Sequence, residues 1–94
     1  MTREEHLLVI LSEECAEVIH AVSKALRFGL NDHHPATLIT NKEIIEKELN
    51  DLGGIIELLR SVYILDTADP TLRFQKIERI EQYLQYSKKV GKLE

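Results

Sequence analysis

Residues 7–25 read LLVILSEECAEVIHAVSKA, and apolar residues recur through this stretch at intervals of three or four positions. Such spacing places them along one side of an α-helix. Thr2 and Glu5, three residues apart just before the stretch, have the form of a capping box. Gly29, just after it, is suited to the end of a helix. The sequence therefore predicts a first helix between Thr2 and Gly29.

Two further helices follow from the same kinds of signal. Thr40 and Glu43 form a second capping box, which predicts a helix that runs to about residue 66. Asp69 and Pro70 are suited to the cap and first turn of a third helix. The segment 31–35 has the composition of a loop. We therefore expect an all-α fold, an antiparallel helical hairpin plus a third helix, in a single domain spanning residues 1–94.

Composition excludes several classes of protein. With 94 residues, 44% of them hydrophobic and 30% charged, the chain has the composition of a folded domain. A net charge of −4 disfavours nucleic acid and anionic membranes as partners. No apolar run reaches the roughly 18 residues of a membrane span, and residues 1–6 do not resemble a signal peptide. The single cysteine, Cys15, fits a reducing compartment, so we expect a cytoplasmic protein.

The distribution of apolar residues predicts self-association. Residues 7–11 are all apolar, so their side chains point in all directions around the first helix. One face of that helix cannot bury all of them inside a short chain. We expect the hairpin to assemble into a helix bundle by oligomerisation, as a homodimer or a tetramer.

Acidic residues interrupt the apolar stripes of the first two helices. Glu14 and Glu17 interrupt the first stripe, and Glu48 and Asp51 interrupt the second, each pair with a spacing that places both residues on one side of a helix. In an antiparallel hairpin, Glu14 and Asp51 are equally far from the centre of the loop, as are Glu17 and Glu48. We therefore expect four carboxylates in one layer, with Glu13 at its margin.

A layer of carboxylates is unfavourable unless it is protonated or binds a cation, because like charges repel and each loses hydration. Hard oxygen ligands favour Mg²⁺, with Mn²⁺ as a second possibility. When the five acids are set aside from the 16, 11 remain against 12 basic residues, so the negative charge is concentrated in this layer. The alternative is that these acids lie on solvated helix edges, paired with Lys24 or Lys47.

Three residues are candidates for binding phosphate. Lys24 lies two turns beyond Glu17, on nearly the same side of the helix. Asn41 lies opposite Lys24 across the hairpin, and Arg27 is one turn further along. The chain has no glycine-rich phosphate-binding loop, so metal ions and cationic side chains would have to hold any phosphates.

Two motifs resemble those of a known superfamily. Glu13–Glu17 has the form EExxE and Glu48–Asp51 the form ExxD, as in the MazG-like all-α nucleoside triphosphate pyrophosphohydrolases. The segment 23–29, SKALRFG, resembles what small phage-type members carry after the first motif, and the resemblance covers residues 5–66. The gap between the two motifs is long, at the upper end of what the superfamily leads us to expect, and the loop around residues 33–35 would absorb it.

The resemblance implies a hydrolase of nucleotide metabolism that converts (d)NTP to (d)NMP and pyrophosphate with Mg²⁺, as a dimer or tetramer. It implies that Glu14, Glu17, Glu48 and Asp51 are metal ligands. It also implies that Glu13 holds or deprotonates the attacking water.

Two other functions are open alternatives. Glu17 and His20 form an ExxH pair, which with Glu48 is half of the site of a ferritin-like di-iron carboxylate protein. The chain is also compatible with a non-catalytic helical dimerisation module, which would need no metal.

Overall fold

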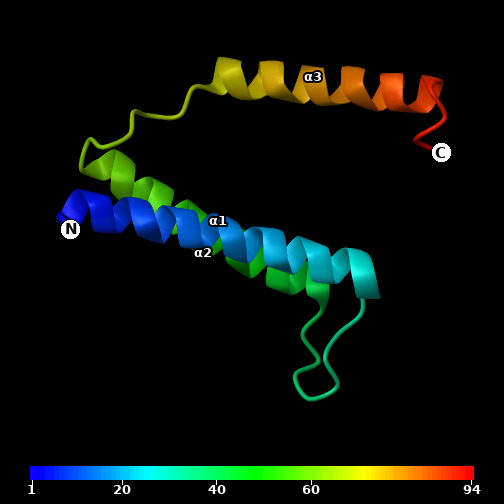
Figure 1. The fold of residues 1–94 in the computed structure, drawn as a ribbon, viewed down its shortest axis with the longest axis horizontal. Coiled ribbons are helices and arrows are strands. Elements are labelled where there is room, and N and C mark those ends of the chain that lie inside the picture. The colour runs from blue at the N-terminus through cyan, green and yellow to red at the C-terminus, as the bar shows by residue number, and fades with distance from the viewer.

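The computed structural model describes all residues from 1 to 94, as three α-helices and no strand. The helices are α1 (Arg3–Phe28), α2 (Asn41–Ser61) and α3 (Pro70–Lys89). Helices α1 and α2 lie side by side in opposite directions, and α3 lies apart from them (Figure 1). The structure therefore confirms an all-α fold made of a helical hairpin and a third helix.

Each helix begins at the residue that the capping pattern predicts. The hydroxyl of Thr2 accepts a hydrogen bond from the backbone N–H of Glu5, and that of Thr40 from the N–H of Glu43, both at 3.1 Å. The carboxylate of Asp69 accepts one from the N–H of Thr71 at 2.9 Å. These bonds satisfy backbone donors that have no partner inside the helix.

The end of α2 differs from the prediction. The helix ends at Ser61 rather than near residue 66, because Tyr63 adopts a left-handed conformation with φ of 63°. The backbone N–H groups of Ile64 and Leu65 both donate back to the carbonyl of Leu59, at 3.0 and 3.2 Å. The side chain of Arg60 donates to the backbone carbonyl of Asp66 at 2.9 Å, so the chain after the helix is fastened to its last turn.

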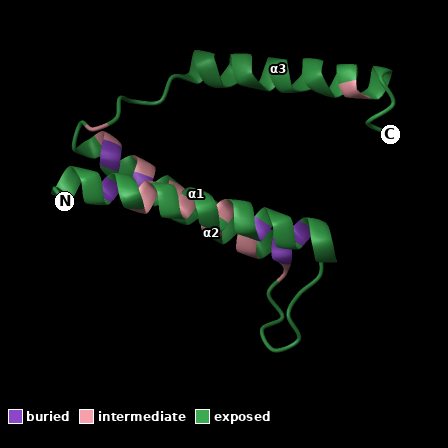
Figure 2. Cartoon of the chain, viewed as in Figure 1, coloured by how far each residue is buried: buried purple, intermediate pink, exposed green.

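The core of the hairpin is small. Leu7 of α1 packs with Ile55 and Leu59 of α2, and Leu59 is the one fully buried large side chain. Ala21 and Ala25 are buried nearer the loop, where small side chains let the helices approach (Figure 2). Six residues in the whole chain are buried, so most of the apolar surface lies open.

The loop between α1 and α2 is closed by the start of α2. The side-chain amide of Asn41 donates to the carbonyl of Gly29 at 2.8 Å, and its backbone N–H donates to Asp32 at 2.9 Å. The N–H of Lys42 donates to Leu30 at 2.9 Å. These bonds fix the register of the hairpin, and with it the heights of the acidic residues.

Helix α3 contacts neither of the other helices, and none of its residues is buried (Figure 2). The radius of gyration is 16.9 Å, against about 12.4 Å for a compact domain of this length. None of the three helices combines the length and the apolar character needed to cross a bilayer.

Candidate metal centre

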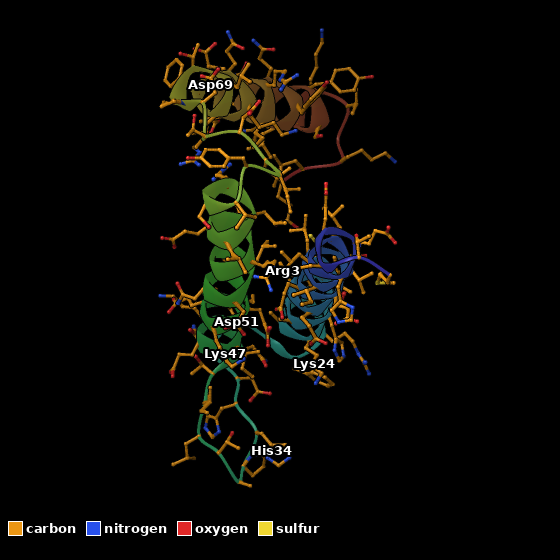
Figure 3. The ribbon with its side chains drawn as sticks, turned by 90° about the vertical axis from the view of Figure 1, so that its left-hand side faces the viewer. Arg3, Lys24, His34, Lys47, Asp51 and Asp69 are labelled. Atoms are coloured by element: carbon orange, nitrogen blue, oxygen red, sulfur yellow. The ribbon has the colours of Figure 1, made fainter.

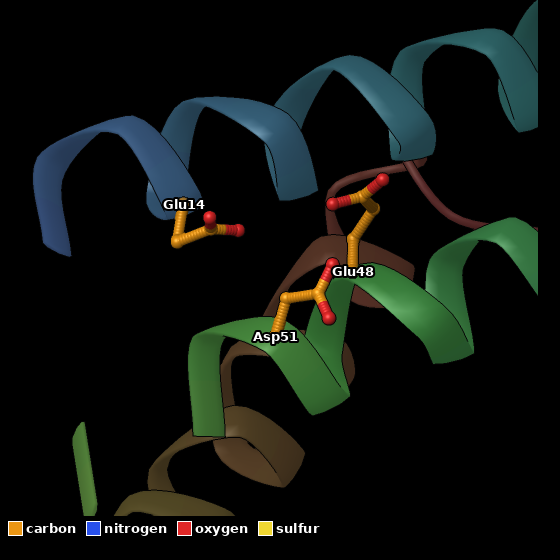
Figure 4. A group of neighbouring side chains, drawn as sticks. All are labelled: Glu14, Glu48 and Asp51. Atoms are coloured by element: carbon orange, nitrogen blue, oxygen red, sulfur yellow. The ribbon is translucent and has the colours of Figure 1, made fainter. Parts of the chain in front are cut away.

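Three carboxylates from the two motifs meet between the helices of the hairpin. One oxygen from each of Glu14, Glu48 and Asp51 lies within 4.8 Å of the other two. Glu14 extends from α1, and Glu48 and Asp51 extend toward it from successive turns of α2 (Figure 4). Glu14 and Glu48 are half-buried, whereas Asp51 is exposed. No other three His, Cys, Asp or Glu side chains in the chain come this close together.

Lys47 partly offsets this negative charge. Its ammonium group lies 2.9 Å from a carboxylate oxygen of Asp51 and 3.5 Å from one of Glu48. The hydrogen bond to Asp51, followed by the charges of Asp51 and Glu48, raises the pKa of Lys47 above 10.5. The pair is exposed to solvent, where such ion pairs contribute little to stability. Glu14 has no ion-pair partner, so part of the charge is left uncompensated.

The donor set fits a hard divalent cation. Mg²⁺ binds carboxylate oxygens at about 2.1 Å in octahedral geometry, so adjacent ligand oxygens lie about 3 Å apart. The oxygens of the trio are up to 4.8 Å apart, so the side chains would have to rotate toward one another to bind one ion. Thiolate and imidazole ligands are missing from the trio, which disfavours zinc and copper.

The structure does not bring Glu17 and Glu13 into this trio. Both are exposed. Glu17 instead shares a hollow of about 100 Å³ with Glu48, His20 and Lys24. A step of three residues falls about 60° short of a full helical turn, so Glu17 points further toward solvent than Glu14 does. Glu13 lines no hollow, and the expected layer of four carboxylates is thus a trio with Glu17 beside it.

Three hollows follow one another along the side of the hairpin that carries these acids, which we call the carboxylate face. The largest, about 460 Å³, lies beside Glu14 and Asp51. Its other lining residues are mainly apolar and come from both helices: Leu7, Ile10, Asn50, Gly54, Ile55 and Leu58. At the other end of the face a hollow of about 290 Å³ lies against the loop.

The three candidate phosphate-binding residues have different environments. Lys24 lines both the smallest hollow and the one against the loop, and it has no ion-pair partner. In Figure 3, Lys24 lies on α1 near the loop that carries His34, while Asp51 and Lys47 lie on α2. Asn41 lines the loop hollow too, but it is buried and its amide N–H is bonded to Gly29. Arg27 lies over the ring of Phe28, 4.8 Å from its centre, and lines none of the hollows.

His20, which the di-iron alternative requires, lines the smallest hollow together with Glu17 and Glu48. It is not part of the close trio.

No protein-family model, curated protein or solved structure matches the chain.

Proposed function

We propose that the protein is a Mg²⁺-dependent nucleoside triphosphate pyrophosphohydrolase, which cleaves (d)NTP to (d)NMP and pyrophosphate. The observation that carries the proposal is the meeting of Glu14 with Glu48 and Asp51. These acids come from an EExxE segment on α1 and an ExxD segment on α2, the motifs that resemble the MazG-like superfamily.

The three carboxylates would hold the cation, because they supply hard oxygen donors and neighbouring side chains neutralise only part of their negative charge. Mg²⁺ usually takes one or two carboxylates and completes its shell with water and substrate phosphates. When bound, it would neutralise the charge of the triphosphate and polarise the phosphorus–oxygen bonds. The carboxylates would also keep the cation at a fixed height in the hairpin, because Glu14 and Glu48 are half-buried on different helices.

The substrate would lie along the carboxylate face. Lys24 has an unpaired ammonium group at the hollows beyond Glu48, where it would contact a phosphate. The largest hollow has an apolar lining beside Glu14 and Asp51, which suits the flat face of a base. Arg27 and Asn41 are weaker candidates for phosphate contact, since each already makes a contact elsewhere.

The reaction itself is a displacement by water. The water oxygen forms a bond to the α-phosphorus, and the bond from that phosphorus to the bridging oxygen breaks, so that pyrophosphate leaves. A carboxylate accepts the proton of the water. Glu17 is better placed for this than Glu13, because it shares a hollow with Glu48 whereas Glu13 lines none. With one exposed cysteine, such an enzyme would suit the reducing cytoplasm.

The experiment is a panel of ribo- and deoxyribonucleoside triphosphates incubated with the full chain and Mg²⁺. Pyrophosphate and orthophosphate are measured separately, with and without added inorganic pyrophosphatase. We expect pyrophosphate as the direct product. Orthophosphate without pyrophosphate, or no hydrolysis of any triphosphate, would contradict the proposal.

Matched variants show whether the trio is responsible. Asp51→Asn and Glu14→Gln keep the size of the side chain and remove its charge, so hydrolysis should fall at least about 100-fold. Glu57→Gln is the control, since Glu57 is an exposed acid of α2 that lines no hollow. It should keep the parent's rate. Equal rates in all three variants would show that the trio is not the site.

A further inference from the structure

Two exposed apolar stripes have no partner in the chain. On α1, positions 8, 12, 15, 19, 22 and 26 are all uncharged and follow one another at alternating intervals of four and three. This α1 seam includes Leu8, Ile19 and Leu26, and Ile19 and Leu26 are 67% and 83% exposed. Ile19 is two residues from Glu17, about 200° around the helix, so the seam faces away from the carboxylates.

The second stripe is on α3. Ile77, Ile80 and Leu84 are separated by three and four residues and are all exposed, at 53%, 43% and 43%. We call these three residues the α3 seam. Alternating intervals of three and four are the pattern by which one helix packs along another in a coiled coil. Each stripe therefore fits a helix as its partner.

The amount of open surface matches a missing subunit. The chain exposes 7872 Å². A compact monomer of 10.8 kDa exposes about 5,500 Å². The excess is about 2,300 Å² for each chain, and covering it in two copies gives an interface in the range of obligate homodimers, about 2,000–5,000 Å² in total.

The chain between α2 and α3 leads α3 away from its own hairpin. Ile64 packs against the core formed by Leu7, Ile55 and Leu59. The hydrogen bonds to Leu59 and from Arg60 hold the chain as far as residue 66. Helix α3 begins four residues further on and lies apart from its own hairpin, where a second molecule can meet it (Figure 1).

Charge also favours a second copy. Helix α3 has five basic and two acidic side chains, a net charge of +3. The rest of the chain has seven basic and 14 acidic side chains, a net charge of −7. An α3 helix is therefore attracted to the hairpin of another copy.

We propose that α3 is an arm exchanged between two copies of this chain, the α3 seam of each packing along the α1 seam of the other. The contact is reciprocal, so a symmetric dimer satisfies both stripes at once. It leaves the carboxylate face of each hairpin uncovered. The proposal does not depend on the metal site or on the reaction.

The test is sedimentation of the full chain over a range of micromolar concentrations. We expect the parent to be a dimer. Ile80→Glu on α3 and Ile19→Glu on α1 should each raise the dimer dissociation constant at least about 100-fold, because each substitution buries two charges per dimer. Gln82→Glu adds the same charge on the other side of α3 and should leave the constant unchanged. Far-ultraviolet circular dichroism checks that each variant remains helical.

Disulfide formation then identifies the contact. Ile80→Cys places a thiol on the α3 seam, and Cys15 already lies on the α1 seam. Oxidation should give a dimer-sized band on a non-reducing gel, and Cys15→Ala in the same chain should abolish it. A monomer-sized product that has lost both thiols would show α3 on its own hairpin. The proposal would also be overturned if the parent sediments with only one copy of the chain per particle, either alone or bound to another protein.

Discussion

The hairpin and α3 have similar local sequence patterns and opposite environments. Helices α1 and α2 pack together and bury Leu7, Ile55 and Leu59 between them. Helix α3 is as well capped as they are, yet every one of its residues lies outside the core. A 20-residue helix on its own is marginal in water, and most helical stability in proteins comes from packing. The hairpin is therefore stabilised by packing within the chain, whereas α3 gains no such packing from the rest of the chain.

The largest effect on stability should come from the core of the hairpin. Leu59 is fully buried, so Leu59→Ala should lower the free energy of unfolding by about 2–5 kcal/mol. Leu72 on α3 is 61% exposed and lies off the α3 seam, so Leu72→Ala should change it by less than about 0.5 kcal/mol. Urea denaturation at one fixed protein concentration measures both. Equal losses in the two variants would contradict the contrast between the regions.

Hydrogen exchange should separate the two regions in a single sample. In Ile80→Glu, which we expect to be monomeric, the backbone amides of α3 should exchange at least tenfold faster than in the parent. The amides of α2 around Leu59 should keep their protection, because their packing lies within the chain. Unchanged protection of α3 in that variant would mean that α3 is stable without a partner.

A smaller effect should distinguish the two kinds of acid in the trio. Glu14 has no ion-pair partner, so Glu14→Gln removes repulsion and should leave the metal-free protein equally stable or up to about 0.5 kcal/mol more stable. Asp51→Asn also removes repulsion, but it loses the ion pair with Lys47 and should gain less. Thermal melting in the presence of a chelator compares the two. A clear loss of stability in Glu14→Gln would indicate a structural role for that carboxylate.

The smallest effect concerns the titration of Lys47. Its pKa in the folded protein is raised from 10.5, so the ion pair with the ionised carboxylates is fully present just below pH 10.5 and is lost as the pH rises through the folded pKa. Because the hydrogen bond to Asp51 is the main cause, Asp51→Asn should bring this pKa back toward 10.5. An NMR titration of the Lys47 side chain measures it. An unchanged pKa in the variant would show that the ion pair is not formed in solution.

Much of the fold could be predicted from local sequence signals. Thr2, Thr40 and Asp69 cap the helices as expected, because a side chain that accepts a bond from the next few backbone N–H groups acts locally. The end of α2 could not be predicted in this way. Tyr63 turns the chain without a glycine, and the turn is fastened by Ile64 packing on a core formed with α1. That contact depends on the tertiary structure.

The candidate site was predicted in part. Counting outward from the loop placed Glu14 beside Asp51 and Glu48, because the register of an antiparallel hairpin fixes heights. A residue's position along the hairpin does not specify the direction in which its side chain points around the helix. The sequence-based prediction therefore groups Glu17 with the other three acids. The sequence offers Lys47 as one partner of the acids, but its bonds to Asp51 and Glu48 depend on rotamers that no sequence pattern specifies. The sequence places Asn41 opposite Lys24 as a candidate for phosphate contact, and its bond to Gly29 also gives it a structural role in closing the loop.

Binding of a divalent cation by the carboxylate trio of the hairpin can be measured by a titration with Mn²⁺ followed by electron paramagnetic resonance. The parent should bind Mn²⁺ saturably, and added Mg²⁺ should compete. Glu14→Gln and Asp51→Asn should each weaken the binding at least tenfold, while Glu57→Gln and His20→Ala should bind as the parent does. Equal binding by all five proteins, or a loss confined to His20→Ala, would show that the trio does not bind the cation.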